Sequence, residues 1–412
     1  MSIKLIHTSD WHLGQTFYDF DRSYEHQQFL VWLKQLLVSE DADVLLISGD
    51  VFDVSNPAAS AVSMFYRFLA ETTRCLPQLQ VIVIAGNHDS AARLEAPNPI
   101  LHYLNVSITG SIEYDENGNI NFRQMIVPLR NKAGVTEAVC LAVPFLRPSD
   151  LGMVSNTAYS EKVAAFYHQL YSVASGQKQP NEAIVAMGHL HLLNAELSEN
   201  DKSERAILGG IEYVPLTAFD PQIAYVALGH IHKAQCIGKN EYVRYCGTPL
   251  PMSFSERNYH HQVVAVTLDE GKPGSIRQIE VPVTVELLCV PTQPKPLMQV
   301  LDELFELSST ELPPERQPYL EVRVLLDEPQ PELRNKIETA IEHKAVRLAK
   351  IDVHYKGENS ASEQYITGEQ LQNLEPLSLF NRIYQNKFNE EPPLQLVELF
   401  NQVTAELNAK EV

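Results

Sequence analysis

Short polar clusters that contain aspartate, asparagine and histidine recur along the first two thirds of the chain. They follow the order D-x-H, G-D, G-N-H-D, G-H and G-H-x-H, and each comes directly after a short apolar run. Taken singly, such clusters are ordinary turn residues, because Gly, Asp and Asn supply unusual backbone angles. Together they gather imidazoles and carboxylates at one end of the expected strands, which is costly unless these groups pair or bind metal. The candidate donors are Asp10, His12, Asp50, Asn87, His189, His230 and His232.

The types of these donors indicate which ions they would hold. Imidazole, carboxylate and amide groups without thiolate suit octahedral Mn²⁺, Fe²⁺ or Zn²⁺ better than a structural zinc site. The set is too large for one ion with an open position, but it suits two ions about 3.5 to 4 Å apart. Asp50 is the natural bridge, because its two oxygens could reach one ion each. Side chains alternate along an extended segment, so we expect Asp10 and His12 to point toward the same metal.

Composition excludes several classes of protein. The chain has 412 residues, 44% of them hydrophobic, and its five cysteines are widely spaced without a C-x-x-C pair. The N-terminus has no signal-like apolar region, and no apolar run approaches the roughly 20 residues that a bilayer requires. We therefore expect a soluble, cytoplasmic protein with reduced thiols and no membrane partner. The formal net charge of −20 argues against DNA binding through a basic surface, so divalent cations would have to attract a phosphate substrate.

The elements that must position the donors alternate between strand and helix patterns. The apolar runs before the clusters are short and β-branched, as in strands buried on both faces. Helical patterns at 22–39 and 59–74 lie between several of these runs. Ligand sites in open α/β sheets gather beyond the carboxyl ends of the strands, where every cluster would fall. The pattern predicts a layered α/β domain over residues 1–281.

The remainder of the chain divides into three parts. After a proline-rich boundary, strand and helix patterns predict a compact βαβαβ unit over residues 282–356. Residues 357–376 are polar and predict a linker. Residues 377–412 predict an amphipathic helical tail. The apolar positions that share one helical face in this tail are Leu396, Phe400, Val403 and Leu407.

The joined motifs resemble those of the calcineurin-like metallophosphoesterase superfamily. More closely, HTSDWHLG, GDVFD, GNHDS, ALGHIHKAQ and RYCGTPLPMSF are similar to the SbcD family, the bacterial nuclease subunits that act with the ATPase SbcC. The resemblance implies a sandwich of two β-sheets flanked by helices, a small cap domain that contacts DNA and a tail that binds the ATPase. It also implies an exonuclease on double-strand DNA ends and an endonuclease on single strands and hairpins, in DNA repair and recombination. Family members form homodimers within a heterotetramer, for which helix 59–74 is the candidate here.

The resemblance also assigns roles by position, with Mn²⁺ as the expected ion and Mg²⁺, Fe²⁺ and Zn²⁺ as alternatives. His88 would face the substrate as general acid or as charge stabiliser for the leaving oxygen. Asp89 would either orient His88 or cap a helix. Asp53 stands where eukaryotic and archaeal relatives carry histidine, so it is at most an outer residue. The first metal would take Asp10, His12, Asp50 and His232, and the second Asp50, Asn87, His189 and His230.

Some assignments remain open at the level of the sequence. His191 is an alternative to His189, although His189 is favoured because it directly follows the strand and Gly188. Arg22 and Arg93 are either contacts to DNA phosphates or scattered surface charges.

Two other functions also fit these residues. One is a small-molecule phosphodiesterase or phosphomonoesterase of the same superfamily, since a metal core does not choose its substrate. The other is a noncatalytic scaffold for DNA ends. The cap and tail favour the nuclease over the first, and the complete donor set favours it over the second.

Overall fold

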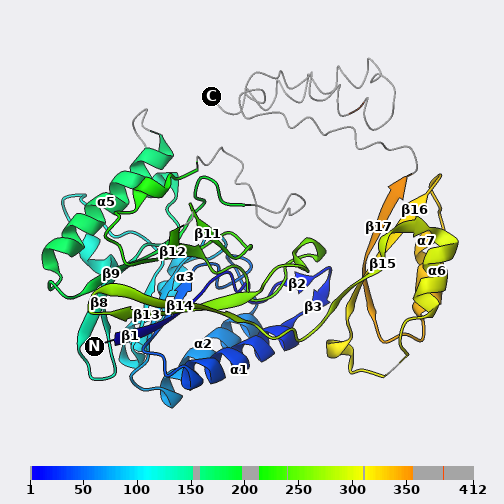
Figure 1. The fold of residues 1–412 in the computed structure, drawn as a ribbon, viewed down its shortest axis with the longest axis horizontal. Helices are drawn as coiled ribbons and strands as arrows, with labels where there is room; N and C mark the ends of the chain where they lie inside the picture. Colours follow the sequence, from blue (N-terminus) through cyan, green and yellow to red (C-terminus); the bar gives the residue numbers. More distant parts are fainter. Residues whose placement is uncertain are drawn as a thin grey trace. The chain divides into compact units, whose positions relative to one another are not determined.

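The computed structural model describes most of the chain up to residue 355. Residues 1–356 form one unit and residues 357–412 a second, and each unit is considered by itself. The predicted linker and helical tail therefore lie outside the described residues, apart from Tyr384. The described residues are 2–151, 158–196, 213–238, 240–309, 311–355 and 384 (Figure 1).

The first of the two large sheets carries the first three polar clusters at the ends of its strands. Its strand order is β14-β13-β1-β4-β5-β6. Strands β1, β4, β5 and β6 run parallel, so the loops after β1, β4 and β5 leave from the same edge. Strands β13 and β14 extend the sheet in antiparallel fashion beside β1. The bounds are β1 Ser2–Thr8, β4 Val44–Ser48, β5 Gln80–Ile84, β6 Val106–Thr109, β13 Gln262–Asp269 and β14 Lys272–Glu280.

The second sheet carries the last two clusters. Its order is β11-β12-β10-β9-β8-β7, in which β8, β9, β10 and β12 are parallel. Strands β9 and β10 are neighbours with Gly229 opposite His189, so their two histidine clusters leave side by side. The bounds are β7 Ile126–Arg130, β8 Thr136–Ala142, β9 Ala183–His189, β10 Tyr225–Gly229, β11 Gln235–Ile237 and β12 Asn240–Tyr245.

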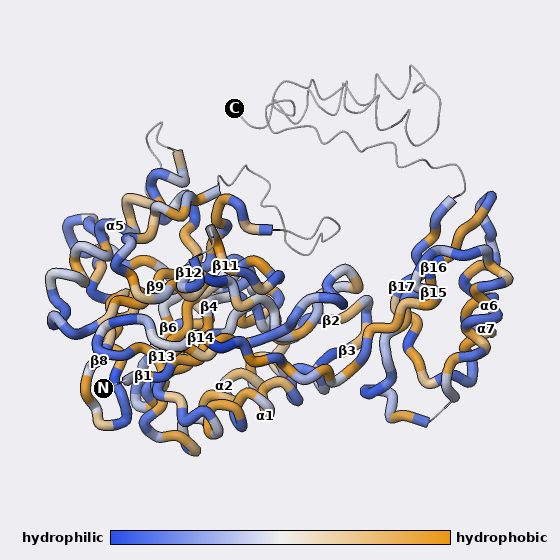
Figure 2. The backbone as a smooth tube through the Cα atoms, viewed as in Figure 1, coloured by the Kyte–Doolittle hydropathy of each residue, from blue (hydrophilic) through white to orange (hydrophobic). Residues whose placement is uncertain are grey.

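The two sheets pack face to face, with helices on their outer faces. Leu46 of the first sheet and Met187 of the second belong to one buried apolar cluster, and both are fully buried. Helices α1 (Ser23–Ser39) and α2 (Ala59–Cys75) cover the first sheet, and α5 (Tyr159–Gln177) covers the second (Figure 1). Figure 2 shows the hydrophobic strands of this interior beneath more hydrophilic loops. The predicted layered sandwich is confirmed, and both predicted helices agree within one residue.

Shorter elements connect these layers. The hairpin β2–β3 follows the first polar cluster directly, and α3 follows the third. Among the described residues, no helix combines the length and apolar character that crossing a membrane requires. The bounds are β2 Thr16–Phe17, β3 Phe20–Asp21, α3 Ala91–Glu95 and α4 Asn98–Leu101, with 3₁₀ turns at 102–104, 122–125, 148–151, 216–218, 254–256 and 314–316.

Residues 287–355 form a separate small sheet with two helices. The strands are parallel in the order β15-β16-β17, and the chain passes through a helix between each pair. Leu320 and Val322 of the central strand pack with Val300 and Ile337 of the helices in an apolar cluster of their own. The βαβαβ pattern is thus confirmed, whereas the domain boundaries at 281, 356 and 376 stay predictions. The bounds are β15 Leu287–Pro296, α6 Leu297–Phe305, β16 Tyr319–Leu326, α7 Leu333–Ile341 and β17 Arg347–Tyr355.

Candidate metal centre

Loops from both sheets meet at one place, and they bring the predicted donors within a few ångströms of one another. Asp50, after β4, has its Oδ2 atom 3.3 Å from His189 Nε2 and 3.8 Å from His12 Nε2. Asn87, after β5, has its Oδ1 atom 2.9 Å from His189 Nε2 and 3.0 Å from His230 Nδ1. Residues as far apart in the chain as His12 and His230 therefore contribute to one cluster.

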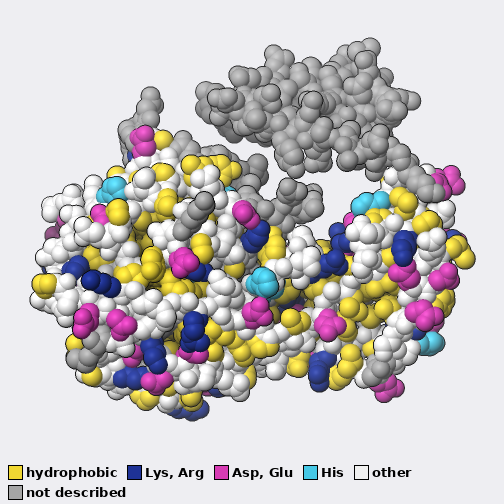
Figure 3. All heavy atoms as spheres, in the orientation of Figure 1, with side chains coloured by type: hydrophobic (Ala, Val, Ile, Leu, Met, Phe, Trp, Pro, Cys, Tyr) yellow, Lys and Arg dark blue, Asp and Glu magenta, His cyan; other side chains and the backbone are white. Residues whose placement is uncertain are grey.

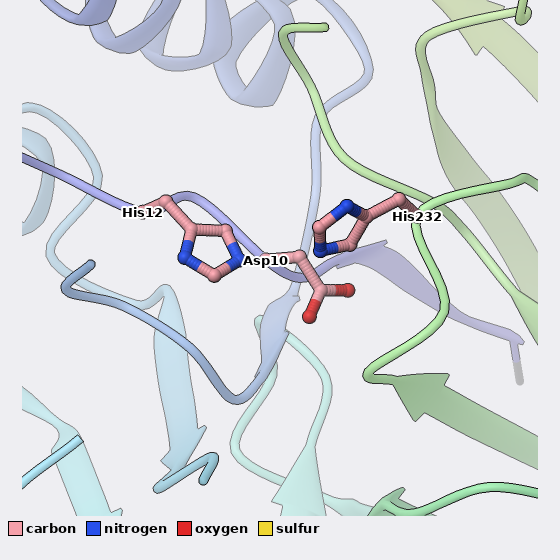
Figure 4. A group of neighbouring side chains, drawn as sticks. All are labelled: Asp10, His12 and His232. Atoms are coloured by element: carbon pink, nitrogen blue, oxygen red, sulfur yellow. The ribbon is translucent and has the colours of Figure 1, made fainter. Parts of the chain in front are cut away.

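One half of the cluster consists of Asp10, His12 and His232. A ligand atom of each lies within 4.8 Å of the others, and Figure 4 shows the ring of His232 approaching from a different loop than the one that carries Asp10 and His12. Both ring nitrogens of His12 are buried without a hydrogen-bond partner among the described residues. The nearest carboxylate oxygens are Asp50 Oδ2 at 3.8 Å from Nε2 and Asp53 Oδ1 at 3.4 Å from Nδ1. A buried imidazole without partners is costly, and a cation placed between these groups would remove that cost.

The other half consists of Asn87, His189 and His230. His189 Nδ1 lies 2.9 Å from the carbonyl oxygen of Ser48, which only accepts, so Nδ1 carries the proton. His189 Nε2 then directs its lone pair at two further acceptors, Asn87 Oδ1 and Asp50 Oδ2. Lone pairs that face one another repel unless a positive charge lies between them. This arrangement requires either a second proton on His189 or a cation.

Asp50 connects the two halves through a single oxygen. Its Oδ1 atom accepts the backbone N–H of His88 at 2.9 Å. Its Oδ2 atom is the one that faces both His12 and His189. The sequence suggests one oxygen for each ion, but the geometry favours Oδ2 as the shared ligand, with Oδ1 held by the backbone.

The backbone of the donor loops is unusual. Asp10, His12, Asp50 and His230 have positive φ angles of 53°, 45°, 47° and 99°, a region that costs most residues of order 1 to 3 kcal/mol. Asp10 N–H donates to the Gly49 carbonyl, and His230 N–H donates to Asp10 Oδ1, which hold these conformations. The segment from Asp10 to His12 is therefore not the extended strand assumed in the sequence argument. The two side chains converge because the chain turns there.

Two glycines allow the loops to approach this closely. A Cβ atom on Gly86 would overlap the Asp50 carboxylate, and one on Gly229 would overlap the carbonyl oxygen of Ser48 on the opposite sheet. The glycines of the G-N-H-D and G-H-x-H clusters are thus needed for close packing between loops.

The ionisable side chains of the centre shift one another's pKa. Burial alone would lower the pKa of His189, but the Asp50 carboxylate outweighs it and raises this pKa to about 9. Burial would raise the pKa of Asp50, yet His189 holds it below its ordinary value. Burial and the neighbouring His189 lower the pKa of His230. Metal binding displaces protons from such ligands, and buried imidazole, carboxylate and amide donors of this kind fit divalent cations.

Comparisons with known proteins agree with this geometry. Residues 3–234 match the family described as calcineurin-like phosphoesterase, and residues 283–388 match the one described as type 5 capsule protein repressor C-terminal domain, SbcD_C. The D subunit of the nuclease SbcCD from Escherichia coli K12 is 31% identical over 97% of both chains. The chain belongs to the SbcD family. Its relative of the same name in Rhodobacter capsulatus is 35% identical over 85% of this chain and 87% of its own, and the one in Bacillus subtilis 168 is 31% identical over 66% and 67%.

In this SbcD-family chain, His88 borders the donors, and one of its ring nitrogens lies within 4.8 Å of ligand atoms of His12 and Asp53. Its Nδ1 atom lies 2.6 Å from the backbone carbonyl oxygen of Asp53 and must donate to it. The ring packs edge-on against His12, with centroids 5.0 Å apart. Because Nδ1 is held in this way, Nε2 is the nitrogen that can address a substrate. Asp53 thus contacts both histidines, one through its carbonyl and one through its carboxylate.

Asp89 has a role that neither sequence interpretation anticipated. Its buried carboxylate accepts backbone N–H groups from Val51, Phe52 and Gly86 at 2.9 to 3.1 Å. It neither contacts the ring of His88 nor caps α3, whose first turn has no side-chain cap. Burial raises the pKa of Asp89 to about 6, and the negative charge of Asp50 adds to the rise. Asp89 ties the loop of Asp50 to the loop of Asn87.

The structure contradicts the DNA contact suggested for Arg22. This side chain is 2% exposed and forms an ion pair with Glu25 at 3.0 Å. It also donates to Gln15 Oε1 and to the carbonyl oxygen of Pro251. Hence Arg22 is a buried structural residue, whose burial the sequence pattern did not reveal. Arg93, on α3, is exposed and stays a candidate.

His191 lies beside the centre. Its ring packs against Tyr213 at 4.7 Å and is 6.1 Å from the ring of His230, between centroids. Burial lowers the pKa of His191. His189 makes the direct contacts to Asn87 and Asp50, so the geometry favours His189 as the ligand.

The sequence argument missed Glu256 and Ser9. Glu256 Oε1 lies 3.0 Å from His232 Nδ1, and the hydroxyl of Ser9 donates to Asp10 Oδ2. The segment RYCGTPLPMSF, which ends two residues before Glu256, served only as a family marker. It forms part of the loop that brings Glu256 behind His232, and nothing local distinguishes this glutamate from surface ones.

Proposed function

We propose that the protein is the nuclease subunit of an SbcCD-type complex, which hydrolyses phosphodiester bonds of DNA with two divalent ions in the bacterial cytoplasm. The observation that carries the proposal is the meeting of donors from two sheets around Asp50 Oδ2, which lies between His12 and His189. Family membership supports the nuclease activity, because the relatives are named as nuclease subunits. Exonuclease action on double-strand ends and endonuclease action on single strands and hairpins are the expected activities in DNA repair and recombination.

The donor set supports specific roles for each half of the centre. Asp10, His12, Asp50 and His232 would hold one ion, and Asp50, Asn87, His189 and His230 the other, with Mn²⁺ as the favoured metal. Such a pair of ions activates water, orients the phosphate and offsets the charge that develops during in-line displacement. The oxygen and nitrogen ligands also accept Mg²⁺, Fe²⁺ or Zn²⁺.

The residues around the donors support the proton transfer. His88 is fixed by its backbone N–H on Asp50 Oδ1 and by its Nδ1 on the Asp53 carbonyl. Because Nδ1–H is held by that carbonyl, this role requires a second proton on the ring, and the Nε2–H of the imidazolium would protonate, or donate a hydrogen bond to, the departing sugar oxygen. General acids of this kind contribute roughly 10²- to 10⁴-fold to rate. The Asp89 contacts to Val51, Phe52 and Gly86 keep the two loops that flank His88 in register.

The surface supports a partner that shares the work of binding DNA. Basic and acidic side chains are interspersed on the face shown in Figure 3, and the chain carries a net charge of −20. Non-specific DNA affinity depends on basic contacts to phosphates, so we assign much of it to an SbcC-type ATPase. We propose that residues 377–412 bind this ATPase as amphipathic helices, and that the cap at 282–356 and Arg93 add DNA contacts.

A homodimer within a heterotetramer is the expected assembly. A groove of about 430 Å³ lies between α1 and α2, lined by Leu30, Val31, Met64 and Phe68 among others. Val31 is 43% exposed, and the apolar side chains of the groove are rimmed by polar and charged residues such as Gln27, Lys34 and Arg67, as at many protein interfaces. We propose this groove as the contact between two copies, which extends the expectation for helix 59–74 to both helices.

The dimer is tested by a charge placed in the groove. Met64→Glu should shift the protein to the monomer mass in light scattering, because pairing would remove an added carboxylate from water. Val38→Glu is the matched control, since Val38 is 52% exposed on the same helix pair but does not line the groove. A Met64→Glu variant that keeps the dimer mass would exclude this interface.

The nuclease activity is tested on end-labelled duplex and hairpin DNA with Mn²⁺ or Mg²⁺, with and without the co-purified ATPase. The expected result is metal-dependent cleavage that the ATPase enhances. Preference for p-nitrophenyl phosphate over DNA and bis-p-nitrophenyl phosphate would favour a small-molecule phosphomonoesterase instead. Fewer than one bound ion per chain in saturating Mn²⁺ would favour a noncatalytic scaffold.

A further inference from the structure

Glu256 is a fully buried carboxylate that lies directly behind the ring of His232. It is 0% exposed, and its Oε1 atom lies 3.0 Å from His232 Nδ1. Its Oε2 atom accepts the backbone N–H of Met252 at 2.8 Å and the hydroxyl of Thr248 at 3.5 Å. A buried carboxylate is costly unless it is paired and hydrogen-bonded. The histidine is therefore a principal partner for this charge.

The loop that carries Glu256 is fixed to the same histidine at its other end. Thr248 N–H donates to the carbonyl oxygen of His232 at 3.1 Å. In the middle of the loop, buried Arg22 donates to the carbonyl oxygen of Pro251 at 2.8 Å. The loop thus holds both the backbone and the ring of His232, and it has little freedom to move Glu256 away.

The carboxylate also selects the tautomer of the ring. Glu256 Oε1 only accepts in its ionised form, so Nδ1 of His232 carries the proton. Nε2 then keeps its lone pair, on the side of the ring where Asp10 and His12 lie (Figure 4). A carboxylate on the distal N–H of a ligand histidine fixes the ring and makes it a stronger metal ligand.

We propose that Glu256 is a positioning residue that keeps His232 in the Nδ1–H tautomer and thereby sets the metal affinity of the half formed with Asp10 and His12. The inference rests on the proposed metal centre and adds to it a residue outside the motifs. It concerns metal binding first and catalysis only as a consequence.

Glu256→Gln is the sharpest variant because it keeps the size of the side chain. Met252 N–H and His232 Nδ1–H face different oxygens of the carboxylate, and in glutamine only one of these two positions is an oxygen. If the amide nitrogen faces the ring, it favours the Nε2–H tautomer, which blocks the nitrogen needed for the metal. The affinity for one of two Mn²⁺ ions should fall about 10- to 100-fold. The Mn²⁺-binding step that Glu256→Gln weakens should be the same step that His12→Asn weakens.

Glu280→Gln is the matched control. Glu280 pairs with His260 at 3.1 Å, but both side chains are more than 70% exposed. The same chemical change there should leave both Mn²⁺ affinities unaltered. An equal loss in this control would overturn the proposal, because the effect would then be one of net charge.

The measurement is a titration of the metal-free full chain with Mn²⁺ alone, followed by electron paramagnetic resonance for free ion and for the spin-coupled pair. The proposal expects two ions and a coupled signal in the wild type, and loss of that signal in Glu256→Gln at stoichiometric Mn²⁺. Equal affinities in the wild type and Glu256→Gln would overturn it. Glu256→Asp, which retains the charge, should give an intermediate affinity.

A second measurement needs no variant of Glu256. Nitrogen-15 spectra of the histidines, with the His232 signal identified by its loss in His232→Asn, report the tautomer in the metal-free protein. The proposal expects Nδ1–H, and an Nε2–H ring would overturn it. A wild type that binds no Mn²⁺ would instead refute the metal centre itself, so failure of the proposed function and failure of this inference are distinguishable.

Discussion

The two halves of the centre differ in what lies behind their histidine rings. In the half with Asp10, the Nδ1 atoms of His12 and His232 face the carboxylates of Asp53 and Glu256, at 3.4 and 3.0 Å. In the half with Asn87, His189 Nδ1 lies 2.9 Å from the neutral carbonyl of Ser48, and a carboxylate oxygen, Asp10 Oδ1, lies farther away at 3.9 Å.

This difference indicates that similar donors need not make equivalent sites. A carboxylate behind a ligand ring increases its basicity more than a carbonyl does, because the negative charge stabilises the positive charge that the metal brings. Asp10 does not distinguish the halves, because its carboxylate lies within 4.8 Å of ligand atoms of His12 and His232 and also of Asp50 and His189. We therefore expect the first half to bind its ion more tightly, and the following changes break or sharpen that contrast.

Removing the shared Asp50 carboxylate should abolish the difference in metal affinity between the two halves. In Asp50→Asn, an amide group replaces the oxygen that faces both His12 and His189, so neither ion should bind at full affinity. Nuclease activity should fall to the level of a protein-free control. Metal analysis of the dialysed protein and the end-labelled DNA assay check this. Loss of only one ion would show that Asp50 belongs to a single half.

Replacing His88, which lies beside the metal donors, should leave metal binding intact but lower turnover. His88→Ala should lower the turnover number roughly 10²- to 10⁴-fold, because the general acid is lost. Its backbone N–H still reaches Asp50 Oδ1, so the content of bound Mn²⁺ should remain that of the wild type. The two quantities are measured by steady-state cleavage and by metal analysis. Full activity, or loss of both ions, would contradict the role of His88.

Added bulk where the two sheets pack together should disturb the geometry of both halves to a similar degree. In Gly229→Ala, the added methyl group overlaps the carbonyl oxygen of Ser48 and crowds His189, which should cost about 1 to 3 kcal/mol of unfolding free energy. Gly176→Ala is the control, because it lies in α5 with open space around it. That change should be neutral or stabilise by up to about 1 kcal/mol. Denaturant unfolding of the two metal-free variants measures the difference, and equal stabilities would exclude the overlap.

Asp53→Asn should give the smallest effect. The Asp53 carboxylate is 3.4 Å from His12 Nδ1 and its side chain is 29% exposed, so solvent screens much of its charge. Mn²⁺ affinity of the first half should fall by less than the ~10-fold expected for a well-aligned outer partner. The backbone carbonyl that holds His88 is retained, so turnover at saturating Mn²⁺ should be unchanged. A larger loss than in Glu256→Gln would reverse the ranking of these two carboxylates.

Much of the fold and the location of the candidate site could be predicted because both depend on local pattern. The runs before Asp50 and Asn87 are apolar and β-branched, and such runs form buried strands in almost any layered fold. The prediction of helices at 22–39 and 59–74 was accurate for the same reason. Since the strands proved parallel, clusters that follow them had to lie at the same edge.

Arguments about single side chains were less successful. Arg22 looked like a surface charge, yet it is buried against Glu25, Gln15 and Pro251. Asp89 looked like a partner of His88 or a helix cap, yet it accepts three backbone N–H groups. Glu25 is only three residues from Arg22, but the other partners of Arg22, and Val51 and Phe52 for Asp89, lie on loops whose approach depends on how the sheets pack. No local pattern encodes that approach.

The sequence by itself determined which atoms could bind metal and which strands deliver them, because donor type and strand pattern are properties of a few neighbouring residues. Only the tertiary structure decided that Asp50 faces both halves through Oδ2, that Asp10 and His12 converge through a turn, and that Glu256 lies behind His232. Each of these depends on distances between residues on separate loops. Such distances follow from the close packing of the two sheets, which leaves no room for even a Cβ atom at Gly229.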